Sequence, residues 1–307
     1  MTLKGHLKGA ATLVLAGLLG LATPVAAQDG KAMTRVDLEL VLAVDISRSM
    51  DEDEHTLQRN GYVDAFRHKE VIDALMSGPE GRIAVTYMEW AGDFDPIVAV
   101  PWTIIDSEAA ARAFADRLAK EPIYGEERTS ISNALITATK LIEGNDIASH
   151  RQAIDVSGDG ANNAGPQVDT VRDEVVKRGI TINGLPIMLE KPKEFYDIDH
   201  LDRYYKHCVI GGPAAFIAPV FDLKQLSNTI RKKLVMEIAA LEVAPGTAPI
   251  QFADAPDAVE PQKAGIVRAQ LRLPKDKTDC TIGEQVWGGG GGGRRGGFGG
   301  FPPPRRP

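Results

Sequence analysis

Residues Val41–Met50 read VLAVDISRSM, an apolar run that ends in one acidic and two hydroxyl side chains. The run has the character of a buried strand in a parallel sheet. Asp45, Ser47 and Ser49 follow at a spacing of two residues. A strand that ends there brings a carboxylate and two hydroxyls into one loop, and such oxygen ligands suit a hard divalent cation. Taken alone, the same residues are also typical of a capped helix start.

Two distant segments extend this pattern. Thr129 precedes a helical pattern in residues 128–135, RTSISNAL. Asp159 ends a second apolar strand in residues 154–160, IDVSGDG. Loops at the carboxyl ends of neighbouring parallel strands meet at one edge of an open α/β sheet. The three loops are therefore expected to converge.

With these residues the chain resembles the von Willebrand factor A (vWA) domain over about residues 36–241. The metal-ion-dependent adhesion site (MIDAS) of that family consists of an Asp-x-Ser-x-Ser loop, a Thr before a helix and an Asp in an Asp-Gly turn. The resemblance implies a Mg²⁺ or Mn²⁺ site whose ligands are Asp45, Ser47, Ser49, Thr129 and Asp159. The later run YYKHCVIGGPAAFIAPV resembles a bacterial subfamily of secreted vWA-like proteins of unknown function.

The alternation of strand and helix patterns predicts an α/β fold: a doubly wound, mainly parallel six-stranded sheet with helices on both faces, vWA-like or Rossmann-like. Strands are expected at residues 36–44, 82–90, 96–105, 152–156, 180–189 and 215–220, the first of them central. Helices are expected at residues 50–76, 107–119, 130–143, 168–178, 195–207 and 222–241. Pro101 cannot donate to a ladder, so the strand around it is expected at an edge. The vWA resemblance implies that this edge strand runs antiparallel.

Both ends of the chain differ in composition from its centre. Residues 1–27 are interpreted as a signal peptide, because Lys4 and Lys8 precede a short apolar stretch and a small-residue cleavage site. The expected parts are the signal peptide at 1–27, a vWA-like domain at 34–241, a partly ordered extension at 242–287 with an extra strand near 266–273, and a disordered Gly/Arg/Pro-rich tail at 288–307. The apolar stretch is too short for a membrane span, so the protein is expected in the periplasm or secreted.

Charge and cysteine content restrict the partners. The chain of 307 residues has a formal net charge of −7, which becomes more negative without the leader, so nucleic acid is excluded as a partner. The two cysteines, Cys208 and Cys280, either remain free thiols or form a disulfide that joins the extension to the domain. In an oxidising compartment the disulfide is favoured.

The leading functional interpretation is a non-enzymatic, metal-dependent adhesion module. In the resembled family, the open coordination position of the ion is completed by an acidic group of a partner protein. One alternative is a metal-assisted hydrolase of phosphate or acyl esters, for which Glu89 and His55 are the nearest candidate bases. A second alternative is a structural envelope protein with a non-functional metal site.

Other motifs are less informative. Gly158 and Gly160 lack the third glycine of a dinucleotide loop, and there is no phosphate-binding P-loop lysine. His200, His207 and Cys208 do not have the spacing of a compact zinc site.

Three further side chains have open roles. Asp155 interrupts a central apolar strand, so it needs a buried partner, either as a structural acceptor or as a group that orients the metal site. Trp90 and Trp102 are expected in the core, and the alternative for either is an anchor for a partner.

Overall fold

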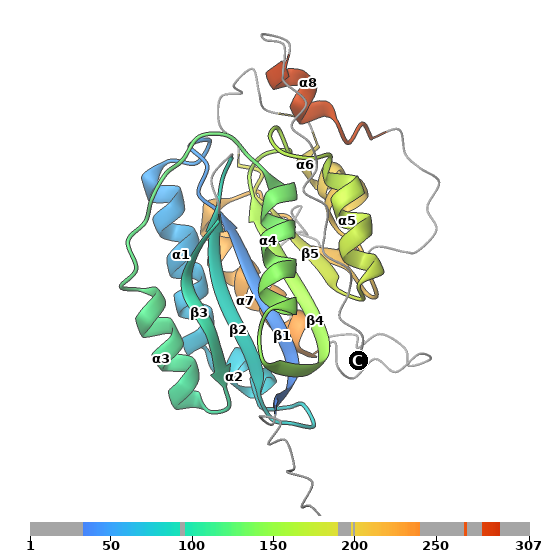
Figure 1. The fold of residues 1–307 in the computed structure, drawn as a ribbon. Helices are drawn as coiled ribbons and strands as arrows, with labels where there is room; N and C mark the ends of the chain where they lie inside the picture. The colour runs from blue at the N-terminus through green and yellow to red at the C-terminus, as the bar shows by residue number, and fades with distance from the viewer. Residues whose placement is uncertain are drawn as a thin grey trace, which may run out of the picture. The chain divides into compact units, whose positions relative to one another are not determined.

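A seven-stranded sheet forms the centre of the molecule (Figure 1). The computed structural model describes residues 33–92, 96–189, 198, 200–239, 267–268 and 278–288. The strands are β1 (Thr34–Asp45), β2 (Ile83–Trp90), β3 (Ile97–Ile105), β4 (Ile147–Gly158), β5 (Thr181–Pro186), β6 (Phe216–Ile217) and β7 (Val267–Arg268). Their order is β3-β2-β1-β4-β5-β6-β7, with β3 and β7 antiparallel to their neighbours. The doubly wound sheet with six strands in the domain is thus confirmed, and β7 is the extra strand expected from the extension.

Helices cover both faces of the sheet. They are α1 (Glu52–Arg67), α2 (Lys69–Leu75), α3 (Glu108–Leu118), α4 (Ile131–Glu143), α5 (Val168–Lys177), α6 (Leu201–Tyr204), the π-helical turn η1 (Tyr205–Val209), α7 (Leu223–Ala239) and α8 (Ile282–Gly288). Helices α1, α2, α3 and α7 pack on one face, and α4, α5, α6 and η1 pack on the other. Figure 1 shows α4 and α5 in front of the sheet and α7 behind it.

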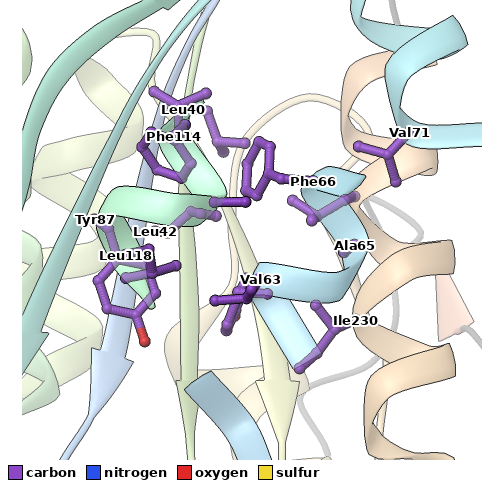
Figure 2. Packing of buried hydrophobic residues seen from close by; sticks show 14 of the residues in the cluster. Leu40, Leu42, Val63, Ala65, Phe66, Val71, Tyr87, Phe114, Leu118 and Ile230 are labelled. Carbon is purple, nitrogen blue, oxygen red and sulfur yellow. The ribbon is translucent and has the colours of Figure 1, made fainter. Parts of the chain in front are cut away.

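The side chains of β1 alternate between two hydrophobic cores. Leu40 and Leu42 point into the core beneath α1 and α7, whereas Val41 and Ala43 point into the core beneath α4 and α5. In the first core, the rings of Phe66 and Phe114 lie 4.6 Å apart between centroids (Figure 2). Burial on both faces explains why this strand reads as a continuous apolar run.

The first predicted helix is two helices in the structure. The chain is extended at His68, with φ −81° and ψ 135°, so α1 ends there and α2 begins. The His68 side chain accepts a hydrogen bond from the backbone of Glu70, which caps α2. The apolar periodicity continues across this break, so the sequence pattern does not reveal it.

Several expectations fall outside the described residues. These are the signal peptide, most of the extension and the tail after Gly288. Within the part of the chain that the structure describes, no helix combines the length and the apolar character that a bilayer crossing requires.

Candidate metal centre

The register of the sheet brings two of the predicted ligands to one edge. Strands β1 and β4 are parallel, and Val44 pairs with Ser157, so Asp45 lies beside Gly158 and one residue from Asp159. A Cβ atom on Gly158 would lie 2.6 Å from Asp45 Oδ2 and 3.1 Å from Asp45 Cβ. Only glycine leaves room for the Asp45 carboxylate at this position.

Hydrogen bonds link the first loop to the Asp-Gly turn. The backbone N–H of Ser47 donates to Asp45 Oδ1 at 2.8 Å, which fixes the carboxylate at the end of β1. The hydroxyls of Ser47 and Ser49 are 2.9 Å apart, and Ser49 Oγ donates to Asp159 Oδ1 at 2.6 Å. Four of the predicted ligands therefore form one connected group.

Thr129 is held beside this group by the loop that follows β4. Its N–H donates to Asn163 Oδ1 at 2.9 Å, and its carbonyl accepts from the Asn163 N–H at 2.8 Å. A Cβ atom on Gly160 would lie 3.4 Å from Thr129 Oγ1. The backbone of Ser130 donates to the carbonyl of Ala91, directly after β2, at 2.7 Å. The ends of β1 and β4 and the segment after β2 thus contact the loops that carry these side chains.

The electrostatics of Asp45 are unfavourable without a cation. Burial raises the pKa of Asp45 well above its ordinary value, and the charge of Asp159 raises it further, while hydrogen bonds from Ser47 oppose the rise. Asp45 is fully buried, and among the described residues its Oδ2 has no hydrogen-bond partner. A buried, unpartnered carboxylate oxygen beside a second carboxylate is costly, and a bound cation removes that cost.

This donor set fits a hard divalent ion. It offers carboxylate and hydroxyl oxygens, which Mg²⁺ and Mn²⁺ accept. Among the described residues, no three His, Cys, Asp or Glu side chains gather as a metal-binding group. The candidate centre therefore depends on its hydroxyls as well as on Asp45 and Asp159.

A cavity of about 290 Å³ lies over the hydroxyls and Asp159. Two arginines, Arg48 and Arg128, line it, as do Asn163 and Glu127. Gly283 and Trp287 of α8 form a further wall. This wall is not evident from the sequence, because its one signal, a tryptophan seven residues after Cys280, lies next to the glycine-rich tail.

The candidate bases of the hydrolase alternative are engaged elsewhere. Glu89 is buried in an ion pair with Arg59 and does not line the cavity. His55 lies beneath the first loop, where its Nε2 is 3.1 Å from the carbonyl oxygen of Ser47, and burial lowers its pKa. Glu127, which does line the cavity, pairs with Arg48 at 3.4 Å.

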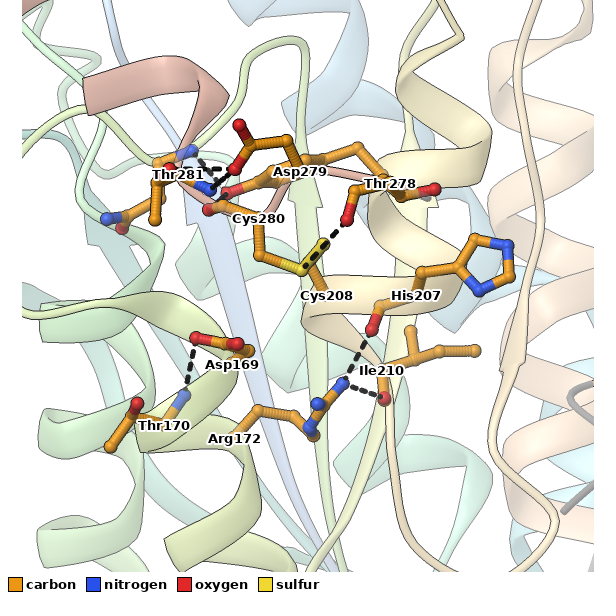
Figure 3. The surroundings of a disulfide bond; sticks show 12 residues. Asp169, Thr170, Arg172, His207, Cys208, Ile210, Thr278, Asp279, Cys280 and Thr281 are labelled. Carbon is orange, nitrogen blue, oxygen red and sulfur yellow. Dashed lines mark hydrogen bonds between the residues drawn. A yellow bond between two sulfur atoms is a disulfide. The ribbon is translucent and has the colours of Figure 1, made fainter. Parts of the chain in front are cut away.

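The cysteines form the disulfide that the composition favoured. Cys208 in η1 and Cys280 before α8 are bonded, with Cα atoms 5.5 Å apart (Figure 3). Cys208 is therefore not a zinc ligand. The buried partner required by Asp155 is Lys233 of α7, whose Nζ lies 2.5 Å from Asp155 Oδ1. Trp90 is in the core, and Trp102 is half-buried and donates to the carbonyl of Leu141.

A family model described as "Protein of unknown function (DUF1194)" matches residues 35–242. The chain belongs to this family. The matched residues include every candidate ligand and stop before α8. No curated protein matches the chain.

Solved structures with a similar arrangement include three proteins of low identity. Proximal thread matrix protein 1 from the mussel byssus is 13% identical, with a TM-score of 0.45, and the match covers 67% of this chain and 49% of that protein. One structure of that protein has a zinc-occupied MIDAS motif. The pilus adhesin SpaC from Lactobacillus rhamnosus GG is 11% identical, with a TM-score of 0.49, and the match covers 66% of this chain and 31% of SpaC. A von Willebrand factor type A protein from Catenulispora acidiphila is 15% identical, with a TM-score of 0.43, and the match covers 66% of this chain and 43% of that protein. The chain thus spans less than half the length of each.

Proposed function

We propose that this protein is an exported protein-binding module that captures an acidic group of its partner through a divalent cation, Mg²⁺ or Mn²⁺. The residues that hold the ion in this proposal are Asp45, Ser47, Ser49, Thr129 and Asp159. The observation that carries the proposal is the buried Asp45 carboxylate with its unpartnered oxygen, next to Asp159 and below a cavity. When bound, the ion supplies positive charge and an open coordination position for a carboxylate.

The side chains of the site have separable tasks in this proposal. Asp45 and Asp159 supply negative charge that retains the ion, whereas the neutral hydroxyls leave much of the ion's charge available to a partner. Ser49 also aligns Asp159 through its hydrogen bond. The cavity lining supports binding over hydrolysis. Besides Asp159, the described lining contains one carboxylate, that of Glu127, and this candidate base pairs with Arg48.

Export is supported by the disulfide, since such bonds persist mainly in oxidising compartments. The protein itself is acidic, with a formal net charge of −7. Simple charge attraction therefore does not bring an acidic partner to it, and a localised cation is needed.

The test is capture of partners from a periplasmic or secreted extract by the immobilised protein. We expect capture with Mg²⁺, loss of capture with chelator, and loss in Thr129→Ala, which removes one hydroxyl ligand. Thr170→Ala is the matched control, because Thr170 is exposed on α5 and does not line the cavity. Circular dichroism shows that each variant is folded.

Two results would contradict the proposal. Capture that survives both chelator and Thr129→Ala places the interface elsewhere. Metal-dependent product release from phosphate or ester substrates, lost in Asp159→Ala, favours the hydrolase instead.

A further inference from the structure

Helix α8 is a fixed wall of the cavity over the candidate metal centre. Its two cavity-lining residues, Gly283 and Trp287, follow the disulfide that joins Cys280 to η1. The other end of that disulfide is also anchored, because Arg172 donates to the carbonyls of His207 and Ile210 on either side of Cys208 (Figure 3). The start of α8 is thus tied covalently to η1, which is itself hydrogen-bonded to Arg172 of α5.

Further contacts set the orientation of α8 against the loop after β4. Asn162 Nδ2 donates to Glu284 Oε1 at 2.8 Å, and Asn162 is itself fully buried. A Cβ atom on Gly283 would lie only 2.1 Å from the carbonyl oxygen of Asn162, so only glycine permits this approach. The hydroxyl of Tyr204 lies 3.2 Å from the Asn162 nitrogen and 3.4 Å from the Cys280 carbonyl oxygen, between the two segments.

This wall places an aromatic ring under an arginine at the rim of the cavity. The guanidinium carbon of Arg128 lies 5.9 Å from the centre of the Trp287 ring. Arg128 has a positive φ of 67° and is exposed. Among the described residues it forms no ion pair, whereas Arg48, the other arginine of the lining, pairs with Glu127. A guanidinium held over an aromatic face keeps its N–H groups available for a carboxylate.

We propose that Arg128, supported by Trp287, is a second anchor of the binding surface and takes a second carboxylate of the partner. This inference rests on the proposed function, in which the first carboxylate binds the ion. Arg128 directly precedes Thr129, so the two anchors are neighbours. In an extended segment, alternate side chains share one face and lie about 7 Å apart. The partner is therefore an extended acidic segment with two acidic residues separated by one residue.

The experiment compares two peptides that differ in the second acidic group alone. The probes are acetyl-Gly-Asp-Gly-Glu-amide and acetyl-Gly-Asp-Gly-Gln-amide, titrated into the full mature chain with saturating Mg²⁺ and followed by calorimetry. We expect the wild type to bind the Glu peptide about threefold to fivefold more tightly, the range of an exposed ion pair. Chelator should abolish binding of both peptides.

Variants identify the anchor. Arg128→Asn should bind both peptides equally while its affinity for the Gln peptide is unchanged; asparagine tolerates the positive φ. Trp287→Ala should reduce the preference, and Trp287→Phe should keep most of it. Arg112→Gln is the matched control and should keep the preference, because Arg112 is exposed on α3 and does not line the cavity. Thermal shift with Mn²⁺ checks that each variant still binds the ion.

The outcomes separate the two proposals. Metal-dependent binding of both peptides with equal affinity by the wild type overturns the second anchor and leaves the proposed function intact. A preference that persists in Arg128→Asn, or is lost in Arg112→Gln, also overturns it. No metal-dependent binding of either peptide contradicts the proposed function, and the second anchor with it.

Discussion

Asp45 is the buried carboxylate of the candidate metal centre. It is fully buried, its Oδ2 has no described partner, and both burial and Asp159 raise its pKa. A raised acid pKa in the folded state means that stability is complete below the ordinary value and is lost as pH rises through the folded one. Without metal, ionisation of Asp45 therefore lowers the stability of the folded protein as pH rises.

Asp45→Asn should abolish the stabilisation of the protein by metal. Without metal the variant should be more stable than the wild type by about 1–2 kcal/mol, because the buried charge is gone. With Mg²⁺ at one hundred times its dissociation constant the wild type should gain about 2.7 kcal/mol and the variant nothing. Melting curves with chelator and with Mg²⁺ measure both effects.

Asp64→Asn, on the exposed face of α1, is the control for loss of one negative charge. An equal Mg²⁺ response in wild type and Asp45→Asn would remove Asp45 from the site.

Helix α7 is joined to the sheet by a buried cluster of two carboxyls and one ammonium. Lys233 Nζ lies 2.5 Å from both Asp155 Oδ1 and Glu237 Oε1, and Asn183 donates to Glu237 Oε1 at 2.9 Å. Burial, followed by the charge of Asp155, raises the pKa of Glu237 to about 8. One proton thus balances the charge of the cluster at neutral pH.

This cluster should make the stability of the protein depend on pH. Because the pKa of Glu237 is raised, its contribution is complete below about 4.5 and is lost as pH rises to about 8. Glu237→Gln should therefore flatten the fall in the free energy of unfolding between these pH values. Urea denaturation at several pH values, with chelator present, measures it.

Glu108→Gln, on the exposed side of α3, should leave that slope unchanged. A wild-type slope that is already flat over this range would show that Glu237 is ionised in the folded protein.

Local patterns predicted the elements that carry the candidate ligands. The run before Asp45, the capped helix after Thr129 and the Asp-Gly turn at Asp159 each lie within a few residues of sequence, so these elements could be predicted locally. The doubly wound sheet was predicted from the alternation of strands and helices together with the vWA resemblance. The pairing of Asp155 with Lys233 could not, because it joins β4 to α7 across a long separation and the helix reads simply as basic. The same holds for Glu89, whose partner Arg59 lies on α1.

Helix α8 escaped prediction for another reason. Its seven residues are too few to show a helical period, and isolated helices of this length are unstable in water. Its place depends on the disulfide and on Asn162, neither of which is visible in the segment itself.

Removing the disulfide should therefore loosen α8 and weaken the protein as a unit. The bond joins residues separated by 72 positions, so Cys208→Ser with Cys280→Ser should cost about 2–4 kcal/mol of unfolding free energy. Acrylamide quenching of tryptophan fluorescence should increase, because Trp287 becomes more accessible when α8 loosens. Trp90 is buried and Trp102 is half-buried, so they contribute less to the change. Trp287→Phe in both backgrounds isolates that signal. Equal quenching with and without the disulfide would show that noncovalent contacts alone hold α8.

The position of Cys280 also orders events in the life of the molecule. The loops at the strand ends need only the sheet, so they form as soon as the domain folds, whatever the redox state. The wall that carries Trp287 is secured last, when Cys208 and Cys280 are oxidised. A chain with both cysteines reduced would have its candidate ligands in place without the covalent tie to the α8 wall of the cavity. Under the proposed function, oxidation would complete the binding surface, because it ties Trp287 to the rest of the cavity lining.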